Sequence, residues 1–379
     1  MNNMQKSFME TGGLSNLIGI VNKHGAKKVL IVAGKGSFAL SGAQEKIKKI
    51  LNNIEIFVFN DFESNPKIKD VIKGIKLVRL KKPDLIVSIG GGSVIDMSKL
   101  IRILTPQSDD DYLNYINNPI KLTDKGLPLV AVPTTFGSGS EATHFAVVYI
   151  DNKKYSLAHH YVKPDYSIID AELCYSLPHY ASASCGMDAL SQAVESYWSI
   201  KSTDESKEYA MEAISLINSV LYDAVCGDKK ARCIMLKAAN LAGKAINITT
   251  TTAPHAISYP LSIFFGISHG HAVSIILGSF FVVNSNYKDY KVSDPRGIDH
   301  LKETMNNLFD IFGVKDAYQC KKNWECLMKK IGLTINLHEL GITSNDDKQL
   351  ILDHINIQRL SNNPMEITND ILSKVLLID

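Results

Sequence analysis

The sequence predicts two domains: an α/β domain with a doubly wound, mainly parallel sheet over residues 1–172, and an all-α domain over residues 173–379. In the first part, short apolar runs that end in glycine-containing turns alternate with helical patterns, which is typical of βαβ units. In the second part, almost all of the hydrophobic periodicity is helical. A chain of 379 residues is also long enough for two domains and a large core.

The apolar runs of the first part are continuous rather than alternating, as expected of strands that are buried on both faces of a sheet. Such strands are expected at residues 29–33, 54–59, 85–89 and 127–132. Helices are expected between them, at residues 42–52, at 66–80 and from the glycine turn at 90–93 to residue 104. Further strands are expected at residues 145–150, 154–157 and 167–170.

Helical periodicity in the second part predicts helices at residues 181–199, 204–225, 229–248, 269–284, 297–313, 321–331, 346–357 and 367–375. In the stretch 249–273, Pro260 and Gly266 argue against one straight helix. We therefore expect a helix, a short bend and a second helix start in this stretch.

Composition and charge exclude several classes of protein. Hydrophobic residues make up 45% and charged residues 21% of the chain, and the formal net charge is +2, so neither a nucleic acid nor a membrane surface is expected as a partner. No apolar stretch approaches the roughly 18 residues that span a bilayer, and the N-terminus lacks the apolar run of a signal peptide. Six cysteines without a C-x-x-C pair indicate reduced thiols, and we expect a cytoplasmic protein.

Two polar loops follow neighbouring strands of the predicted sheet. The first, GGGSVID at residues 90–96, joins a strand to a helix whose free N–H groups suit a pyrophosphate, and Asp96 would fix first-turn amides or a ribose hydroxyl. The second, PTTFGSGSEAT at residues 133–143, is rich in glycine and hydroxyl groups that suit phosphate, ribose and carboxamide contacts. A tight turn without a ligand is the alternative for the first loop alone. Both loops together favour a dinucleotide site.

The turn after the first strand bears on the choice of cofactor. An acidic residue at the end of an early strand often holds the adenosine ribose, but this strand ends with Gly34 and Lys35. The missing carboxylate permits NADP(H) and mildly favours it over NAD(H), with Lys35 or Ser37 as a phosphate ligand. The alternative is that Lys35 is a solvated turn residue.

Three residues of the second part have the types expected of metal ligands. His255 and His269 flank the bend in the stretch 249–273, and Asp188 lies on a helix face with Gln192 four residues later. One carboxylate and two imidazoles that face a common point suit a divalent metal with an open position for a substrate. The alternatives to metal binding are structural: the histidines would be hydrogen-bonded residues of the core, and Asp188 would cap a helix near Ser182 and Ser184.

With these motifs in view, the chain resembles the iron-containing (group III) alcohol dehydrogenase family along nearly its whole length. The resemblance rests on GGGSVIDMSK at 90–99, PTTFGSGSEAT at 133–143, GMDALSQAVES at 186–196 and the segment from His255 to His269. It implies a dehydroquinate synthase-like fold, an N-terminal dinucleotide-binding domain, a C-terminal catalytic domain, an active site in the cleft between them, and a homodimer.

The resemblance also implies a ligand set for Fe²⁺, or for Zn²⁺, which fits the same residues: Asp188, Gln192, His255 and His269. Gln192 stands where the family typically has histidine, so it is either an oxygen ligand or an outer residue, with water or His271 completing the sphere. Tyr259 stands where many members carry a further histidine. For the cofactor site we predict Gly34, Lys35, Asn65, Gly91, Gly92, Ser93, Asp96, Thr134, Thr135, Ser138 and Lys154. A solvated role for Lys154 stays open.

The implied reaction interconverts an aldehyde and a primary alcohol with NADP or NAD, the metal acting as a Lewis acid on the carbonyl. Tyr259, His271 or a cofactor ribose hydroxyl would relay the proton. A finer resemblance, to a subgroup that includes phosphonoacetaldehyde reductases, rests on Gln192, residues 253–259, residues 270–273 and residues 359–364. An anionic substrate would need a cation, for which the candidates are Lys201, Lys244 and Arg359.

Other functions remain open at this point. A metal-independent reductase of the maleylacetate reductase type is suggested by Gln192. A lyase like dehydroquinate synthase shares the layout but needs more cationic residues around the metal. A nucleotide-binding protein with a decayed site is the third alternative.

Overall fold

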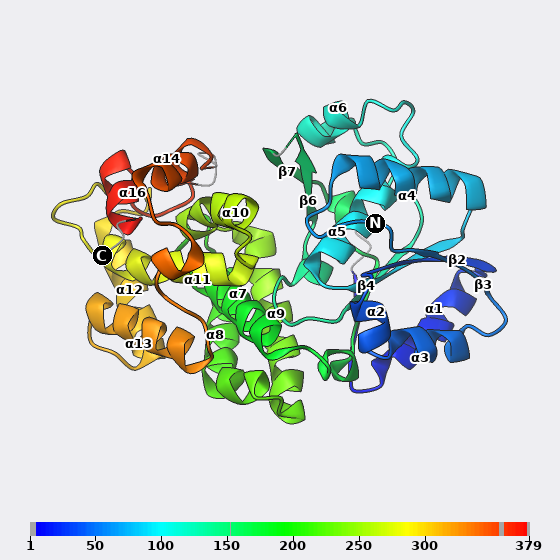
Figure 1. Ribbon diagram of the computed structural model, residues 1–379, viewed down its shortest axis with the longest axis horizontal. Coiled ribbons are helices and arrows are strands. Elements are labelled where there is room, and N and C mark those ends of the chain that lie inside the picture. Colours follow the sequence, from blue (N-terminus) through cyan, green and yellow to red (C-terminus); the bar gives the residue numbers. More distant parts are fainter. Residues whose placement is uncertain (1–4, 152, 356–359, 377–379) are drawn as a thin grey trace. The chain divides into compact units, whose positions relative to one another are not determined.

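The computed structural model describes residues 5–151, 153–355 and 360–376, and the chain divides into two compact units, Met1–Leu177 (unit 1) and Pro178–Asp379 (unit 2). Figure 1 shows the strands in unit 1, while unit 2 consists of helices and connecting segments. The α/β and all-α characters are as predicted. The functional domain limits, 1–172 and 173–379, stay a prediction.

Unit 1 is built on a six-stranded sheet of order β1-β8-β5-β4-β2-β3, in which every pair of neighbours is parallel. The strands are β1 (Lys6–Met9), β2 (Lys28–Ala33), β3 (Glu55–Phe59), β4 (Leu85–Gly90), β5 (Leu129–Pro133) and β8 (Tyr166–Ile169). Strand β1 was not predicted because its residues, KSFM, are mostly exposed at the edge of the sheet and form no apolar run.

Alternate residues of the central strands enter two hydrophobic cores, one on each face of the sheet. Leu30 and Val32 of β2 face the core that contains α4 (Ile68–Lys81) and α5 (Gly92–Leu104). Val29 and Ile31 face the core that contains α1 (Asn16–Lys23), α2 (Ser37–Leu40) and α3 (Ala43–Ile50). Helices on both faces of a parallel sheet make unit 1 doubly wound.

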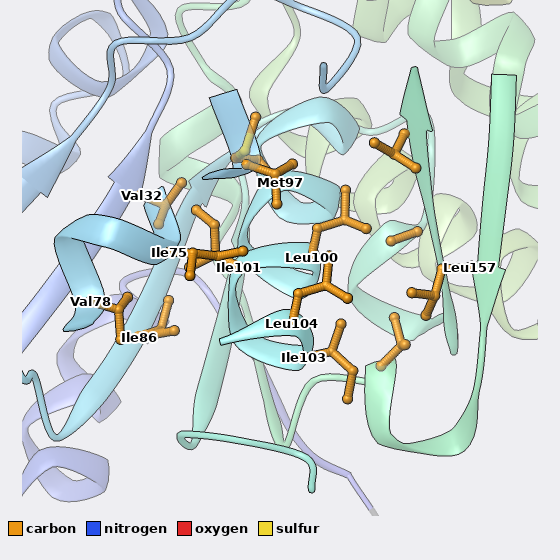
Figure 2. Packing of buried hydrophobic residues seen from close by; sticks show 14 of the residues in the cluster. Val32, Ile75, Val78, Ile86, Met97, Leu100, Ile101, Ile103, Leu104 and Leu157 are labelled. Carbon is orange, nitrogen blue, oxygen red and sulfur yellow. The ribbon is translucent and has the colours of Figure 1, made fainter. Parts of the chain in front are cut away.

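Helix α5 is the most deeply buried helix of its face of the sheet. Figure 2 shows Met97, Leu100, Ile101, Ile103 and Leu104 of this helix packed among side chains of α4, β2, β4 and β7. The hairpin of β6 (Phe145–Ile150) and β7 (Lys153–Ala158) forms a separate antiparallel sheet that contributes to the same core. The glycine turn therefore leads into a helix that is anchored in the core of unit 1.

The strand order reverses between β2 and β4, which are neighbours whose following helices lie on opposite faces of the sheet. In open α/β sheets a ligand binds outside the carboxyl ends of the strands at such a switch point. The turn after β2 and the turn after β4 lie together here, because a Cβ added to Gly34 would be 3.6 Å from Cγ2 of Val94. The sheet thus places the predicted cofactor residues Gly34 and Gly91 at its switch point.

Unit 2 is arranged around α7 (His179–Trp198), which is buried along most of its length. It packs against α8 (Asp204–Val225), α9 (Lys229–Thr249), α11 (His269–Val283) and α12 (Ile298–Phe312). The other α-helices among the described residues of this unit are α10 (Ala253–Phe265), α13 (Ala317–Lys330), α14 (Asn345–Asp353) and α16 (Asn369–Val375). The predicted bend is present: α10 ends before Gly266, whose φ of 68° ends the helix in the left-handed region, and α11 begins at His269.

Candidate active site

One face of α7 presents three polar side chains in succession: Asp188, Gln192 and Glu195. Their spacing of four and then three residues places them on one side of the helix. All three are buried, with exposed fractions of 6%, 3% and 0%. Asp188 lies in the middle of α7, which begins at His179, so the alternative that Asp188 caps a helix is wrong.

The side chains of Asp188, His255 and His269 converge. Each offers one potential ligand atom, and these atoms lie within 4.8 Å of one another. Oδ1 of Asp188 is 3.5 Å from Nε2 of His255 and 3.9 Å from Nε2 of His269. Sequence reasoning therefore predicted the three residues that the fold brings to one point.

Charge interactions stabilise the ionised form of this group. Burial raises the pKa of Asp188, but its contact with His255 and the charge of His269 outweigh this effect and bring the pKa below its usual range. Burial likewise lowers the pKa of His255, yet Glu195 and Asp188 raise it to about 10. The buried carboxylate of Asp188 therefore stays ionised and can interact with a positive charge.

The donor set fits a divalent cation. Oδ1 of Asp188 and Oε1 of Gln192 are buried and have no hydrogen-bond partner among the described residues. Buried polar atoms normally have partners, and two orphaned oxygens beside two imidazoles are those that a cation or a water molecule would satisfy. The side chain of Gln192 interacts with that of Asp188, one helical turn earlier on α7.

Sequence reasoning did not single out Glu195, which contacts His255 directly. Its Oε2 pairs with Nδ1 of His255, while Oε1 accepts hydrogen bonds from N of Thr252 (2.9 Å), Oγ1 of Thr252 (2.9 Å) and N of His255 (3.3 Å). The signal was present in the spacing, since Glu195 follows Asp188 by two helical turns on the same face.

The loop that precedes α10 is held by contacts from distant parts of unit 2. Asn362 donates to O of Thr249, Oγ1 of Thr250 and O of Thr251. Nε1 of Trp198 donates to Oγ1 of Thr252 at 3.0 Å. Thr250 has a φ of 58°, which is strained for a β-branched residue, so these contacts hold a conformation that the loop would not adopt alone.

Gly270 allows α11 to approach α7. A Cβ at this position would lie 2.0 Å from O of Ser184 and 2.8 Å from Cβ of Asp188, and the first of these is a backbone atom of a buried helix. This close approach brings His269, the preceding residue, next to Asp188.

We expect Gly270→Ala to destabilise the protein by about 2–3 kcal/mol, since α11 must move away from α7 to admit the methyl group. Urea unfolding at equilibrium measures this change. Gly19→Ala is the matched control: Gly19 lies inside α1, and a Cβ there meets no atom within 4 Å. The control is expected to be neutral or to stabilise by up to about 1 kcal/mol. Equal stability of the two variants would contradict the proposed packing constraint.

The two predicted catalytic residues have different surroundings. Tyr259 lies one helical turn after His255, and its ring stacks on that of His269 at 5.8 Å between centroids. His271 uses both ring nitrogens: Nδ1 is 3.2 Å from the hydroxyl of Tyr180, and Nε2 is 2.7 Å from O of Thr334. Because a carbonyl only accepts, Nε2 carries the proton and Nδ1 accepts from Tyr180. Burial lowers the pKa of His271.

Several of the predicted cofactor residues of unit 1 lie on adjoining turns. A Cβ on Gly92 would be 2.6 Å from Oγ of Ser138, and a Cβ on Gly91 would be 3.4 Å from the side chain of Thr135, so the glycines let the two loops touch. Asn65 has a φ of 62° and donates from its backbone N to Oγ of Ser93 at 3.2 Å. Oγ1 of Thr134 is buried without a partner among the described residues.

Of the two roles expected of Asp96, binding the amides of its own first turn is wrong, and contact with a ribose hydroxyl stays a prediction. Asp96 accepts from Oγ of Ser140 (2.5 Å) and from N of Val147 (3.0 Å), so it fastens the second loop and β6 to α5 instead of capping the first turn. Lys99, one turn later, is fully buried and donates to Oγ of Ser140 and Oγ1 of Thr143. Burial lowers the pKa of Lys99 to about 8. The two residues form a polar link that holds the loop in place.

The two predicted cofactor lysines differ in burial: Lys35 is exposed and Lys154 is partly buried. Nζ of Lys35 is 3.7 Å from Oδ1 of Asp61, a residue just past β3 that also faces Lys73 at 3.6 Å. Sequence reasoning missed this carboxylate. Lys154 belongs to the hairpin strand β7, opposite Tyr149.

Glycine turns at the switch point of a parallel sheet, together with a carboxylate–imidazole group in a helical unit, indicate the class of metal-dependent, nucleotide-linked oxidoreductases. The chain belongs to the iron-containing alcohol dehydrogenase family. The family model "Iron-containing alcohol dehydrogenase" matches residues 5–171, and "Fe-containing alcohol dehydrogenase family, C-terminal" matches residues 182–377. The chain is therefore an oxidoreductase, as the motifs predicted.

Individual relatives agree with this assignment. The chain is 30% identical to the NADPH-dependent butanol dehydrogenase of Clostridium saccharobutylicum, with 92% of this chain and 90% of the relative covered. It is 32% identical to the phosphonoacetaldehyde reductase of Streptomyces viridochromogenes, with 79% and 77% covered. The crystal structure of sulfoacetaldehyde reductase from Bifidobacterium kashiwanohense in complex with NAD⁺ matches with a TM-score of 0.86 and 29% identity, over 98% of this chain and 95% of that one.

Within the described residues, no helix has the length and apolar character needed to cross a membrane.

Proposed function

We propose that the protein is a metal-dependent NAD(P)H oxidoreductase that interconverts an aldehyde and a primary alcohol. The observation that carries the proposal is the convergence of Asp188, His255 and His269 within 4.8 Å, beside the orphaned oxygen of Gln192. Family membership supports iron as the cation, and zinc suits the same donors. When bound, the cation supplies a Lewis acid for the carbonyl oxygen and the nicotinamide supplies the hydride.

The residues of unit 2 would hold and orient these groups. Asp188 offers a charged oxygen, His255 and His269 offer Nε2 atoms, and Gln192 offers a neutral oxygen in place of a third imidazole. His269 keeps 39% of its side chain exposed, whereas Asp188 and His255 are almost fully buried. This asymmetry supports an open position on the His269 side, where a substrate would enter.

For proton transfer we propose Tyr259 and His271 as the candidates. Tyr259 is stacked against His269, so its ring lies next to a proposed ligand. His271 accepts from Tyr180, which is 48% exposed, and this pair would pass a proton between the interior and solvent.

In unit 1, the switch point with Gly34, Gly91, Gly92 and Ser93 would bind the dinucleotide, with Thr134, Thr135 and Ser138 on the adjoining turn. Gly34 carries no carboxylate that would repel a 2′-phosphate, and Lys35 lies beside it. These features favour NADP(H), and the relatives include one protein named as NADPH-dependent. Asp61 faces Lys35 and would weaken this preference.

For the substrate we propose an aldehyde with an anionic head, such as phosphonoacetaldehyde, which would be reduced to 2-hydroxyethylphosphonate. The names of two relatives, a phosphonoacetaldehyde reductase and a sulfoacetaldehyde reductase, support such a substrate. Of the candidate cations, Lys244 lies over the ring of Tyr209 and Lys201 is exposed, while Arg359 lies outside the described residues.

The test is an assay of purified protein freed of metal by a chelator and then loaded with Fe²⁺ without oxygen, or with Zn²⁺. We expect aldehyde-dependent oxidation of NADPH, slower oxidation of NADH, and loss of both on removal of the metal. Phosphonoacetaldehyde and sulfoacetaldehyde are compared with acetaldehyde and butyraldehyde. Equal rates with all four aldehydes would refute the proposal that the substrate carries an anionic head.

The same experiment distinguishes the metal-dependent reaction from the metal-independent alternative. The alternative is favoured by the presence of Gln192 where the family typically has a histidine ligand. Undiminished activity in protein shown by elemental analysis to be metal-free would establish it and refute the metal-dependent proposal.

We also propose that the protein is a homodimer and acts in the cytoplasm. Light scattering at micromolar concentration tests the oligomeric state.

A further inference from the structure

We infer that Glu195 is a positioning residue that fixes the tautomer of His255, so that Nε2 is available to a divalent cation. This inference rests on the proposed metal-dependent function. Glu195 itself contributes no atom to the group of Asp188, His255 and His269.

Glu195 is a buried carboxylate whose charge is balanced by hydrogen-bond donors. Its side chain has no exposed surface, and no lysine or arginine among the described residues forms an ion pair with it. Burying an isolated carboxylate is costly, so its charge has to be balanced by donors. Those donors are the backbone N of Thr252, the hydroxyl of Thr252, the backbone N of His255 and Nδ1 of His255.

The imidazole of His255 is oriented by its contact with Glu195. Because Glu195 accepts from Nδ1, the proton of a neutral His255 lies on Nδ1 and the lone pair lies on Nε2. Nε2 is the atom that faces Oδ1 of Asp188, at 3.5 Å. Imidazoles that bind metals commonly donate their other N–H to a carboxylate in this way, which fixes the ring and strengthens the ligand.

Neighbouring groups fix the direction of each hydrogen bond to Glu195. Nε1 of Trp198 donates to Oγ1 of Thr252, which leaves the proton of that hydroxyl for Oε1 of Glu195. Oε1 is thereby saturated by three donors, and only Oε2 is left for His255. Glu195 links α7, which carries Asp188, to the first turn of α10, which carries His255.

The variant Glu195→Gln tests the inference, because it keeps the shape of the side chain. Its amide oxygen can still accept from Thr252 and from the backbone of His255. Its amide nitrogen then faces Nδ1 of His255, and two donors cannot bond. His255 must present a lone pair at Nδ1 and carry its proton on Nε2. We expect the affinity for Zn²⁺, measured by competition with a chromogenic chelator, to fall by about 10- to 100-fold.

The control is Thr252→Val, which removes a hydroxyl donor to Oε1 but leaves the bond between Glu195 and Nδ1 of His255 in place. A merely structural role for Glu195 predicts that both variants lower the melting temperature of the metal-free protein, while Glu195→Gln keeps the wild-type affinity. That result would overturn the inference. A larger loss of affinity in Glu195→Gln than in Thr252→Val supports it.

Two further outcomes keep the inference separate from the proposed function. Wild-type protein that binds neither Zn²⁺ nor Fe²⁺ would refute the proposed function itself, and the inference with it. Should Glu195→Gln fail to fold, nitrogen NMR of the zinc-loaded wild type with labelled histidine decides. A protonated Nδ1 and a metal-bound Nε2 in His255 support the inference, and the reverse arrangement overturns it.

Discussion

Replacing Asp188 with asparagine is expected to reduce the metal-dependent reduction of aldehydes by at least about a thousand-fold, which corresponds to about 4 kcal/mol of transition-state stabilisation. Asp188 supplies the charged oxygen of the group, and His255 and His269 already hold its pKa below the usual range. An amide of the same shape keeps the volume but removes the charge that would face the proposed cation. Steady-state kinetics after metal loading, with the bound metal measured in the same samples, give the result.

A matched control for this variant comes from the same helix. Ser191 is also fully buried, and its Oγ has no hydrogen-bond partner among the described residues. Ser191→Ala should retain both the metal content and the turnover of the wild type, because the group contains no atom of Ser191. If Asp188→Asn bound metal and turned over substrate at the wild-type level, the ligand set proposed here would be wrong.

Replacing Asn362 with aspartate is expected to destabilise the protein by about 3–5 kcal/mol. The amide nitrogen of Asn362 donates to O of Thr249 (2.9 Å), Oγ1 of Thr250 (3.1 Å) and O of Thr251 (3.0 Å). In aspartate an oxygen would replace this nitrogen and would face two carbonyl oxygens in a buried place. The strained backbone of Thr250, with φ at 58°, would lose the contacts that hold it.

Equilibrium unfolding in urea measures the effect of Asn362→Asp on stability. Asn53→Asp introduces the same chemical change at an exposed residue of unit 1 and should alter stability by less than about 0.5 kcal/mol. Because the loop carries Thr252, a partner of Glu195, the affinity for Zn²⁺ should fall as well. An Asn362→Asp variant as stable as Asn53→Asp would show that the loop does not depend on this side chain.

Elements with a strong hydrophobic pattern could be predicted from the sequence. The runs that became β2, β4 and β5 are continuous and apolar, and parallel strands buried on both faces need that pattern. Strand β1 could not be predicted in the same way. Its residues are mostly exposed, and it is a strand because it pairs with β8, which is about 160 residues later in the chain.

The roles of single polar residues were predicted unevenly. Asp188 and the two histidines were predicted because their chemical types and the family motifs indicate a metal, although no sequence spacing requires His255 to lie 3.5 Å from Asp188. Asp96 was expected to bind its own first turn or a ribose. The first-turn role is wrong, because its partners in the protein, Ser140 and Val147, come from a loop and strand more than 40 residues away. The contact with a ribose stays a prediction. Partners that are distant in the chain depend on packing, and no local pattern encodes them.

The sequence by itself determined the class of fold, the positions of the glycine turns and the identity of the three candidate ligands, because each depends on residue type and local periodicity. Only the tertiary structure decided that Glu195 would hold His255 and that Asn362 would hold the loop beneath it. It also showed that Gly270 is needed where α11 meets α7. Those contacts join residues that are distant in the chain, and they form only when the helices of unit 2 pack together.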